Sequence, residues 1–344
     1  MRLRDLGLFV GGMAPGPLNA ITDVPRVEVG QASWITDHPA IQRSGVTVIY
    51  PGRDMYQRPC YAATDILNGF GELTGQATID EWGIVASPIV LTNTRSVGNG
   101  YEAIYEHFFS IPEEELDDDA LPLPVVGECD DSFLNDSRHP NPMEIFRQAF
   151  RDVSSGPVAE GAVGAGSGMH LFGYKGGIGT SSRQVRIYGQ SYMVGVLVNT
   201  NFGRPYQLRL KAGLEMYQPP QDVPRDGSCI GVVATDAPVW PHELKRLARR
   251  IGMGLARTGS VGNDTSGEIF LAFSTAERHQ YAEVANAGGQ FTGRHDGDAA
   301  PMTLLFDAVT DCAEEAVWNA LLAAGTVHGV DGHVLQGFHQ PDNH

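Results

Sequence analysis

The sequence lacks any long apolar run. No segment approaches the roughly 20 apolar residues of a membrane helix, and glycines break the run Leu6–Val10 before a signal-peptide core could form. Cysteine is also scarce: Cys60, Cys129, Cys229 and Cys312 lie far apart, with no CxxC or CxxH pair. This spacing argues against a cysteine metal site and a disulfide framework. We therefore expect a soluble cytoplasmic protein with no membrane partner and no metal.

Positive charge is in short supply. The 344 residues include 24 Lys and Arg against 41 Asp and Glu, which gives a formal net charge of −17 at pH 7. Such a field repels a polyanion, and no basic stripe is visible, so nucleic acid is excluded as a partner. Hydrophobic residues make up 42% of the chain, which is enough to build two domains or one large α/β unit.

Apolar segments that favour strands occur along the chain, and two amphipathic helices follow late in it. A helix is expected from Pro241 to Gly259 because leucines and isoleucine recur there every three or four residues. A second is expected from about Asp311 to Gly325, with Glu314 completing a capping box. Together these elements predict a layered α/β architecture. The expected strands are apolar on both faces, as in a covered sheet, and comprise Val46–Tyr50, Gly83–Leu91, Tyr192–Val198, Ile230–Ala234 and Ile269–Phe273.

Three segments raise the question of a binding site. The acidic run at residues 112–119 favours a solvated loop over a cation site, and the proline-rich residues 216–226 favour a surface loop. The stretch GYKGGIGTSSR, residues 173–183, lacks the P-loop spacing and leads into a strand-like segment. It is therefore more consistent with a structural hairpin or the wall of a site than with a phosphate cradle.

The histidines and one serine motif raise the question of catalysis. His328, His333, His339 and His344 crowd the C-terminus, where we expect a polar tail and no metal centre. The stretch GAGSG does not match the GxSxG pattern of a nucleophile elbow.

A serine preceded by glycine begins one apolar strand, in the stretch RDGSCIGVVATDAP. If the bond between Gly227 and Ser228 were cut, Ser228 would carry a hydroxyl and a free amine together. An α-amine with a pKa near 8 can take the hydroxyl proton without a histidine. The missing side chain of Gly227 would let the hydroxyl reach the preceding carbonyl and would permit strained backbone angles. From residue types alone, an ordinary loop-to-strand junction remains the simpler interpretation.

Polar residues also mark the ends of two other apolar strands. Ser266 and Glu268 are two residues apart, so their side chains share a face of the strand, where the carboxylate could hold an ammonium or orient a hydroxyl. Asn199 and Asn201 end the strand in VLVNTNFG, and such an amide N–H can stabilise an oxyanion. Polar strand ends and an asparagine turn before glycine are the structural alternatives.

The chain resembles the family of L-aminopeptidase/D-esterases and β-peptidyl aminopeptidases along nearly its whole length. The ordered blocks that carry this resemblance are RDLGLFVGGMAPGPLNAITDVPRVEVG, LTNTRSVG, PVVGECDDSFLND, GGIGTSSR, VLVNTNFG, DGSCIGVVATDAP, RLARRIGMGLARTGS and SGEIFLAFST. Members of this family are self-processing hydrolases with a nucleophile at a new N-terminus.

The resemblance implies a role for each candidate residue. Cleavage is expected between Gly227 and Ser228, with the Ser228 hydroxyl as nucleophile and its freed amine as general base. The pair of Ser266 and Glu268 matches the residues beside that amine that relay protons and hold its charge. Asn201 matches the asparagine of the oxyanion hole.

The motif GECDDSF matches the family's substrate pocket, with one departure. Glu128 matches a carboxylate that binds the ammonium group of the substrate. Asp130 stands where relatives can carry an aromatic residue, so it implies a more polar substrate-binding pocket. A second departure is Cys229, where relatives often have isoleucine. Because successive strand side chains face opposite ways, we expect Cys229 in the core and not as a rival nucleophile.

We therefore predict one α/β domain, a four-layer αββα sandwich like that of N-terminal nucleophile hydrolases, which matures into residues 1–227 and 228–344. The predicted function is a serine aminopeptidase without cofactor, which removes the first L-, D- or β-residue from a peptide, amide or ester. The resemblance also implies a homotetramer of processed pairs. The alternatives are an acyltransferase of the ornithine acetyltransferase type and a non-catalytic binding protein of the same fold.

Overall fold

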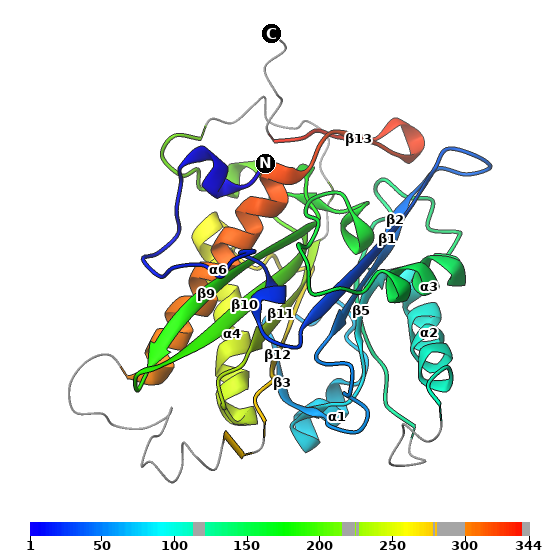
Figure 1. Ribbon diagram of the computed structural model, residues 1–344. Helices are drawn as coiled ribbons and strands as arrows, with labels where there is room; N and C mark the ends of the chain where they lie inside the picture. The colour runs from blue at the N-terminus through cyan, green and yellow to red at the C-terminus, as the bar shows by residue number, and fades with distance from the viewer. Residues whose placement is uncertain (113–120, 215–223, 225–226, 278, 281–299, 339–344) are drawn as a thin grey trace.

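Two β-sheets lie face to face in the computed structural model, as Figure 1 shows. The structure describes residues 1–112, 121–214, 224, 227–277, 279–280 and 300–338. The four-stranded sheet has the order β1-β2-β5-β6, and the six-stranded sheet has the order β4-β3-β12-β11-β10-β9. Two-stranded ribbons, β7-β8 and β13-β14, lie outside these sheets.

The strands range from short edge segments to long central ones. Those of the four-stranded sheet are β1 (Glu28–Thr36), β2 (Gln42–Tyr50), β5 (Ile89–Asn93) and β6 (Val125–Cys129). Those of the six-stranded sheet are β3 (Cys60–Ile66), β4 (Ile84–Val85), β9 (Ile178–Ile187), β10 (Gln190–Asn201), β11 (Gly227–Thr235) and β12 (Ser266–Ser274). The ribbons comprise β7 (His170–Leu171), β8 (Tyr174–Lys175), β13 (Val327–His328) and β14 (Val334–Leu335).

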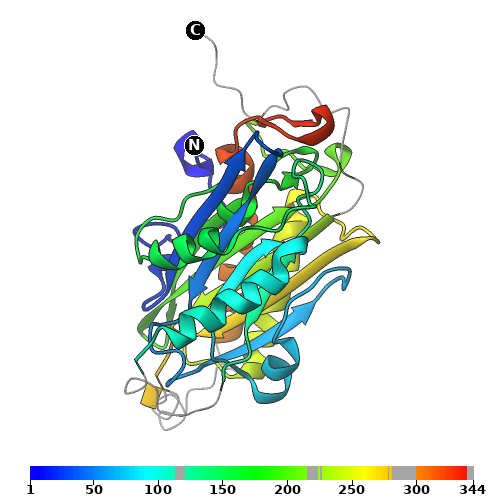
Figure 2. The ribbon, with the colours of Figure 1, turned by 90° about the vertical axis from the view of Figure 1, so that its right-hand side faces the viewer.

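Helices cover the outer face of each sheet. The pair α4 (Pro241–Thr258) and α6 (Pro301–Ala323) packs on the six-stranded sheet, and α2 (Val97–Phe109) and α3 (Met143–Arg151) pack on the four-stranded sheet. Figure 2 shows α2 and α3 in front of their sheet. The short α1 (Gln76–Trp82) packs beside β3 and β4. The predicted αββα sandwich is therefore confirmed.

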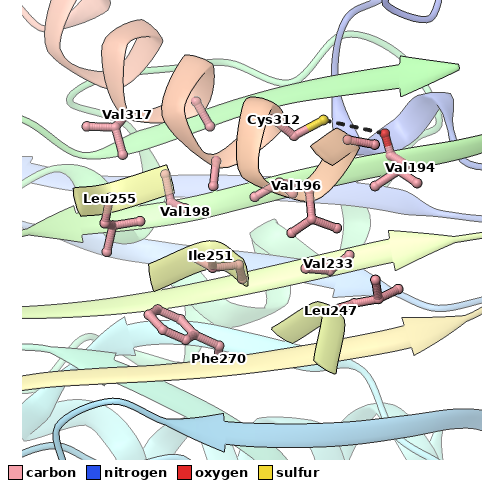
Figure 3. Packing of buried hydrophobic residues seen from close by; sticks show 14 of the residues in the cluster. Val194, Val196, Val198, Val233, Leu247, Ile251, Leu255, Phe270, Cys312 and Val317 are labelled. Atoms are coloured by element: carbon pink, nitrogen blue, oxygen red, sulfur yellow. Dashed lines mark hydrogen bonds between the residues drawn. The ribbon is translucent and has the colours of Figure 1, made fainter. Parts of the chain in front are cut away.

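A hydrophobic cluster fills each of the three interfaces between layers. Figure 3 shows the cluster beneath α4 and α6, where Leu247 and Ile251 of α4 lie beside Val233 of β11 and Phe270 of β12. The α4 side chains recur every three or four residues and so form one apolar stripe. Burial of each such side chain contributes about 1.5–3 kcal/mol. The stripe confirms the predicted helix from Pro241 and fixes α4 on the sheet.

Two of the predicted elements have different bounds. The segment Gly83–Leu91 is not one strand, because Ser87-Pro88 separates β4 from β5, and these belong to different sheets. Proline cannot donate to a sheet ladder, which explains the break. The last helix begins at Pro301 and not near Asp311. The predicted capping box is wrong, since Asp311 lies inside the helix and its carboxylate pairs with Arg257 at 2.6 Å.

Three strand ends meet at one edge of the six-stranded sheet. Strand β10 runs antiparallel to β11, so the end of β10 lies beside the beginning of β11. Strand β12 runs parallel to β11, so its beginning lies at the same edge. The polar residues that end or begin these strands are thus brought together from positions far apart in the sequence. Strands before and after Gly227 share this sheet.

Several sequence predictions lie wholly or largely outside the described residues. Of the acidic run at residues 112–119, only Pro112 is described. Of the proline-rich residues 216–226, only Pro224 is described. The last two histidines, His339 and His344, lie outside the described residues. Within the ranges that the structure does describe, no helix is both long and apolar enough to cross a membrane.

Candidate active site

The Gly227–Ser228 bond lies at the first residues of β11. Ser228 is the register partner of Asn201 in β10 and of Gly267 in β12. The Ser228 side chain is almost buried, with 4% of its surface exposed, yet it lines a cavity of about 420 Å³. A nucleophile in this position is fixed by two neighbouring strands and still accessible to a small substrate.

Gly227 lies where a side chain would be closely crowded. A Cβ atom at this position would stand 3.0 Å from Ser266 Oγ and 3.2 Å from the Asn201 carbonyl oxygen. Its φ is not among the left-handed values of the described glycines, so the expected strained angle is not observed. The absent side chain instead leaves Ser266 close to the peptide that precedes Ser228.

Asn201 holds the Ser228 hydroxyl. Its Nδ2 donates to Ser228 Oγ at 3.2 Å and to the backbone carbonyl of Asp130 at 2.8 Å. Its Oδ1 accepts a hydrogen bond from the backbone N–H of His170 at 3.1 Å. Because every polar atom of this amide is engaged, its orientation is fixed with the donor towards Ser228. Such a donor is suited to an oxyanion that forms near Ser228.

Ser266 and Glu268 form a buried pair beside Gly227. The Ser266 hydroxyl donates to Glu268 Oε1, and Asn68 Nδ2 donates to Glu268 Oε2 at 2.9 Å. Both residues of the pair are almost fully buried. Burial raises the pKa of the Glu268 carboxyl, and the hydrogen bonds from Ser266 and Asn68 partly counter this shift. The pair can therefore exchange a proton with a group at the start of β11.

Glu128 lies across the cavity at the end of β6. The backbone N–H of Glu72 donates to Glu128 Oε1 at 3.0 Å, and the Thr94 hydroxyl donates to Oε2. Only 6% of Glu128 is exposed. Burial raises the pKa of its carboxyl, while these two hydrogen bonds lower it, and the nearby charge of Asp130 raises it further. A cation entering the cavity would relieve the cost of this buried charge.

The cavity carries a second carboxylate. Asp130 is exposed and accepts hydrogen bonds from the backbone N–H and the hydroxyl of Ser132, at 2.9 Å and 2.8 Å. No lysine or arginine is among the described residues that line the cavity. The wall is therefore acidic and polar. Its lining residues are Phe70, Thr94, Glu128, Asp130, Ser132, Phe133, Gly168, His170, Asn201, Pro224, Gly227, Ser228 and His333.

Aromatic residues complete the cavity, and sequence reasoning missed them. The ring of His333 stacks on that of Phe133, with centroids 4.2 Å apart, so this histidine belongs to the cavity wall and not to a polar tail. Phe70 and His170 also line the cavity. Asn68, the hydrogen-bond partner of Glu268, was missed as well. Phe133 could have been found from the sequence, because it stands three residues after Asp130 in the motif GECDDSF. No motif of the sequence analysis marks Phe70, His170 or Asn68 as part of the site.

The structure shows where Cys229 and the glycine-rich stretch lie. Cys229 is fully buried in the cluster beneath α4 and α6, as expected, and burial raises the pKa of its thiol. The glycine-rich stretch 173–183 forms β8 and the start of β9, so it leads into a strand and not into a helix. In the part of the chain that the structure describes, no group of three or more metal-ligating side chains occurs.

Comparison with known proteins identifies the family. The sequence model of peptidase family S58 matches residues 19–335. The chain belongs to peptidase family S58. It is 41% identical to a beta-peptidyl aminopeptidase, BapA, of Sphingosinicella microcystinivorans over 97% of this chain and 89% of that protein. As a member of this family the chain is a peptidase, and its relatives support an aminopeptidase function.

Solved structures of S58 relatives have the same fold. A Burkholderia sp. beta-aminopeptidase superposes with a TM-score of 0.85, at 38% identity, over 98% of this chain and 95% of that chain. The L-aminopeptidase D-Ala-esterase/amidase from Ochrobactrum anthropi superposes with a TM-score of 0.82, at 37% identity, over 98% and 95%. The latter is described as a variant among the Ntn hydrolase fold. This S58 peptidase therefore has an Ntn-like fold.

Proposed function

We propose that this S58 peptidase is a self-processing serine aminopeptidase whose nucleophile is Ser228. The observation that supports this most directly is that Asn201 and Ser228 line a cavity with acidic residues, while the buried Ser266–Glu268 pair lies at the same sheet edge. This arrangement provides a hydroxyl, an oxyanion donor and a proton relay within one site.

Maturation is an N-to-O acyl shift followed by hydrolysis. Ser228 Oγ attacks the Gly227 carbonyl, the C–N bond breaks, and the hydroxyl proton ends on the departing Ser228 nitrogen. Ser266 lies beside this peptide and, with Glu268, can carry the proton. Water then cleaves the new ester, which releases the Gly227 carboxylate and restores the Ser228 hydroxyl. The product is a pair of chains, residues 1–227 and 228–344.

Turnover repeats the same chemistry on a substrate. The freed amine of Ser228 takes the proton of its own hydroxyl, and Oγ attacks the carbonyl after the first residue of the substrate. Asn201 Nδ2 stabilises the oxyanion, and the proton passes to the leaving amine as the acyl-enzyme forms. Water then hydrolyses the acyl-enzyme. None of these steps requires a cofactor.

The acidic cavity favours a small substrate with a free amino group. Glu128 is placed to bind that ammonium, since it is a buried carboxylate without a cationic partner among the described lining residues. The names of the relatives indicate β-peptides, L-aminoacyl compounds and D-alanine esters or amides as substrate classes. We propose a substrate in these classes, a peptide, amide or ester with an unblocked first residue.

Replacement of Ser228 by alanine tests the proposal. We expect Ser228→Ala to remain one uncut chain of 37.0 kDa by intact mass and to release no p-nitroaniline from aminoacyl p-nitroanilides. Cys229→Ala is the matched control, and it should be cut and active because Cys229 faces the core. A Ser228→Ala protein that still splits between Gly227 and Ser228 would disprove the assignment of the nucleophile.

The same proteins distinguish the alternative functions. An acyltransferase would move an acetyl group to ornithine and leave the aminoacyl amides intact, and a binding protein would remain uncut in the wild-type sequence. Either result with wild-type protein contradicts the proposed aminopeptidase.

A further inference from the structure

One buried charge near Ser228 has no role in the chemistry above. Lys175 ends β8, in the glycine-rich stretch, and none of its surface is exposed. Its Nζ donates hydrogen bonds to three backbone carbonyls, those of Gly166 at 2.8 Å, Met169 at 2.7 Å and Gly176 at 2.8 Å. Two of these, Gly166 and Met169, belong to the segment that carries Gly168 and His170 into the wall of the cavity.

The three carbonyls are suited to the charged form of the lysine. An ammonium has three N–H donors, whereas a neutral amine has two and would turn its lone pair towards the third carbonyl. Burial lowers the pKa of Lys175 to about 7, and the buried carboxyl of Asp131 opposes this shift. The three carbonyl acceptors match the three donors of an ammonium, so the geometry favours a cation at Lys175, held by backbone oxygens.

One peptide group connects this cation to Asn201. The carbonyl that accepts the 2.7 Å hydrogen bond from Lys175 belongs to Met169, and the N–H of the same peptide group belongs to His170. That N–H donates to Asn201 Oδ1 at 3.1 Å, and Asn201 Nδ2 donates to Ser228 Oγ at 3.2 Å. An unbroken chain of hydrogen bonds thus runs from the ammonium through two amides to the nucleophile.

Each link of this chain strengthens the next. A cation at the carbonyl oxygen draws electrons from the peptide and makes its N–H a better donor. The Asn201 amide, polarised in the same way, then becomes a better donor at Nδ2. The effect is larger where water is excluded, and Lys175, Met169 and Asn201 are all buried.

We propose that Lys175 is a positioning residue for the oxyanion hole, which orients and polarises the Asn201 amide through the peptide between Met169 and His170. This inference rests on the proposed role of Asn201. Lys175 is not among the described residues that line the cavity, and under this proposal its effect on kcat passes through Asn201. Its removal should therefore weaken the transition state and leave substrate binding intact.

A double-mutant cycle tests this coupling. We expect Lys175→Met to lower kcat of the mature enzyme roughly tenfold, with KM within about twofold, because one full oxyanion donor is worth roughly 100- to 1000-fold. It should slow precursor cleavage similarly. In an Asn201→Ala background, Lys175→Met should change kcat less than twofold, since no amide is left to polarise. The exposed Lys245→Met is the matched control for loss of one positive charge and should leave kcat unchanged.

The outcomes separate this inference from the proposed function. A tenfold loss that persists in the Asn201→Ala background, or a loss that appears in KM, would overturn the relay and leave the role of Asn201 intact. If Asn201→Ala does not lower kcat, both the oxyanion assignment and the relay are wrong, while the Ser228→Ala test stands alone.

A spectroscopic measurement covers the case in which Lys175→Met does not fold. Lys175→Gln retains a donor without the charge, and it can be combined with Ser228→Ala to give a homogeneous precursor. In the NMR spectrum of this precursor labelled with 15N-asparagine, the Asn201 side-chain amide protons should move upfield relative to Ser228→Ala alone, because a weaker hydrogen-bond network deshields them less. Unmoved Asn201 signals would overturn the relay.

Discussion

Replacement of Glu128 by glutamine isolates the charge of one carboxylate with little change in shape. The Oε1 position can still accept the backbone N–H of Glu72, and the new amide can donate to the Thr94 hydroxyl, which rotates to accept. The cavity therefore keeps its form while the proposed partner of the substrate ammonium loses its charge. Precursor cleavage should continue, because the Gly227 carbonyl is attacked without any ammonium group.

The magnitude of this effect follows from burial. Glu128 is 6% exposed, so its contact with a substrate ammonium is largely desolvated. Loss of one partner from a buried, hydrogen-bonded charge pair costs about 2–5 kcal/mol, and 1.4 kcal/mol corresponds to a factor of ten. We expect Glu128→Gln to lower kcat/KM for free-amine substrates by roughly 100-fold.

The pH dependence gives a second signature of Glu128. Burial raises the pKa of the carboxyl above its ordinary value, and only the ionised form binds an ammonium. In the wild-type enzyme kcat/KM should therefore fall on acidification, beginning at a higher pH than an exposed glutamate would give. Glu128→Gln should lack this limb of the profile.

The assay compares aminoacyl p-nitroanilides with des-amino analogues that have the same acyl chain. Glu128→Gln should narrow the difference in kcat/KM between the two substrates, with a small effect on the analogue. Glu72→Gln is the matched control, since it removes a nearby glutamate charge outside the described cavity lining, and it should change kcat/KM by less than about threefold. An equal loss on both substrates would show that Glu128 is structural and refute the reasoning.

Three further predictions concern stability and are measured by urea denaturation of the uncut precursor. Gly267→Ala should lower the free energy of unfolding by about 1–3 kcal/mol, since its Cβ would lie 2.3 Å from the Phe70 carbonyl oxygen. An unchanged urea midpoint would show that the backbone at Phe70 moves aside at no cost. Arg183→Leu should destabilise by about 1–3 kcal/mol, because it removes the fully buried partner of Glu315 at 2.6 Å and leaves Arg4 as the ion-pair partner of this carboxylate; a loss under about 1 kcal/mol would contradict this. Burial raises the pKa of Asp131 from 3.8 to about 7, so between these pH values the folded state keeps a proton that the unfolded state releases. Stability should therefore fall as pH rises from about 4 to 7, by up to about 1.4 kcal/mol per unit, and Asp131→Asn should flatten this slope.

The site was predictable from sequence to the extent that its residues stand at the ends of apolar strands. Asn201 ends one such strand, and Ser228 and Ser266 begin two others. Short apolar runs bounded by polar residues and glycine indicate strands in a covered sheet. They do not indicate which strands are neighbours. The resemblance to a family supplied that step, and the register of β10, β11 and β12 explains it.

Other features could not be predicted because their cause lies in tertiary contacts. His333 stands in a polar C-terminal stretch, and nothing local shows that its ring stacks on Phe133. The helix that begins at Pro301 appeared to begin near Asp311, since the intervening residues suited either state and only packing against α4 extends the helix. The three carbonyl partners of Lys175 are backbone atoms and leave no pattern in the sequence.

The parallel pairing of β11 with β12 bears on the proposed self-cleavage, in which Ser228 is first an internal residue of the precursor and then a terminal one. Gly227 pairs with Ser266 and Ser228 with Gly267, so both sides of the cut bond are held by the same neighbouring strand. After the proposed cleavage, Ser228 would still be held by the sheet pairing of the residues that follow it in β11. The oxyanion donor on β10 also stays in register with Ser228. The proposed maturation would therefore free an amine without rebuilding the site, so under this proposal Asn201, Ser266 and Glu268 assist both the self-cleavage and each later turnover.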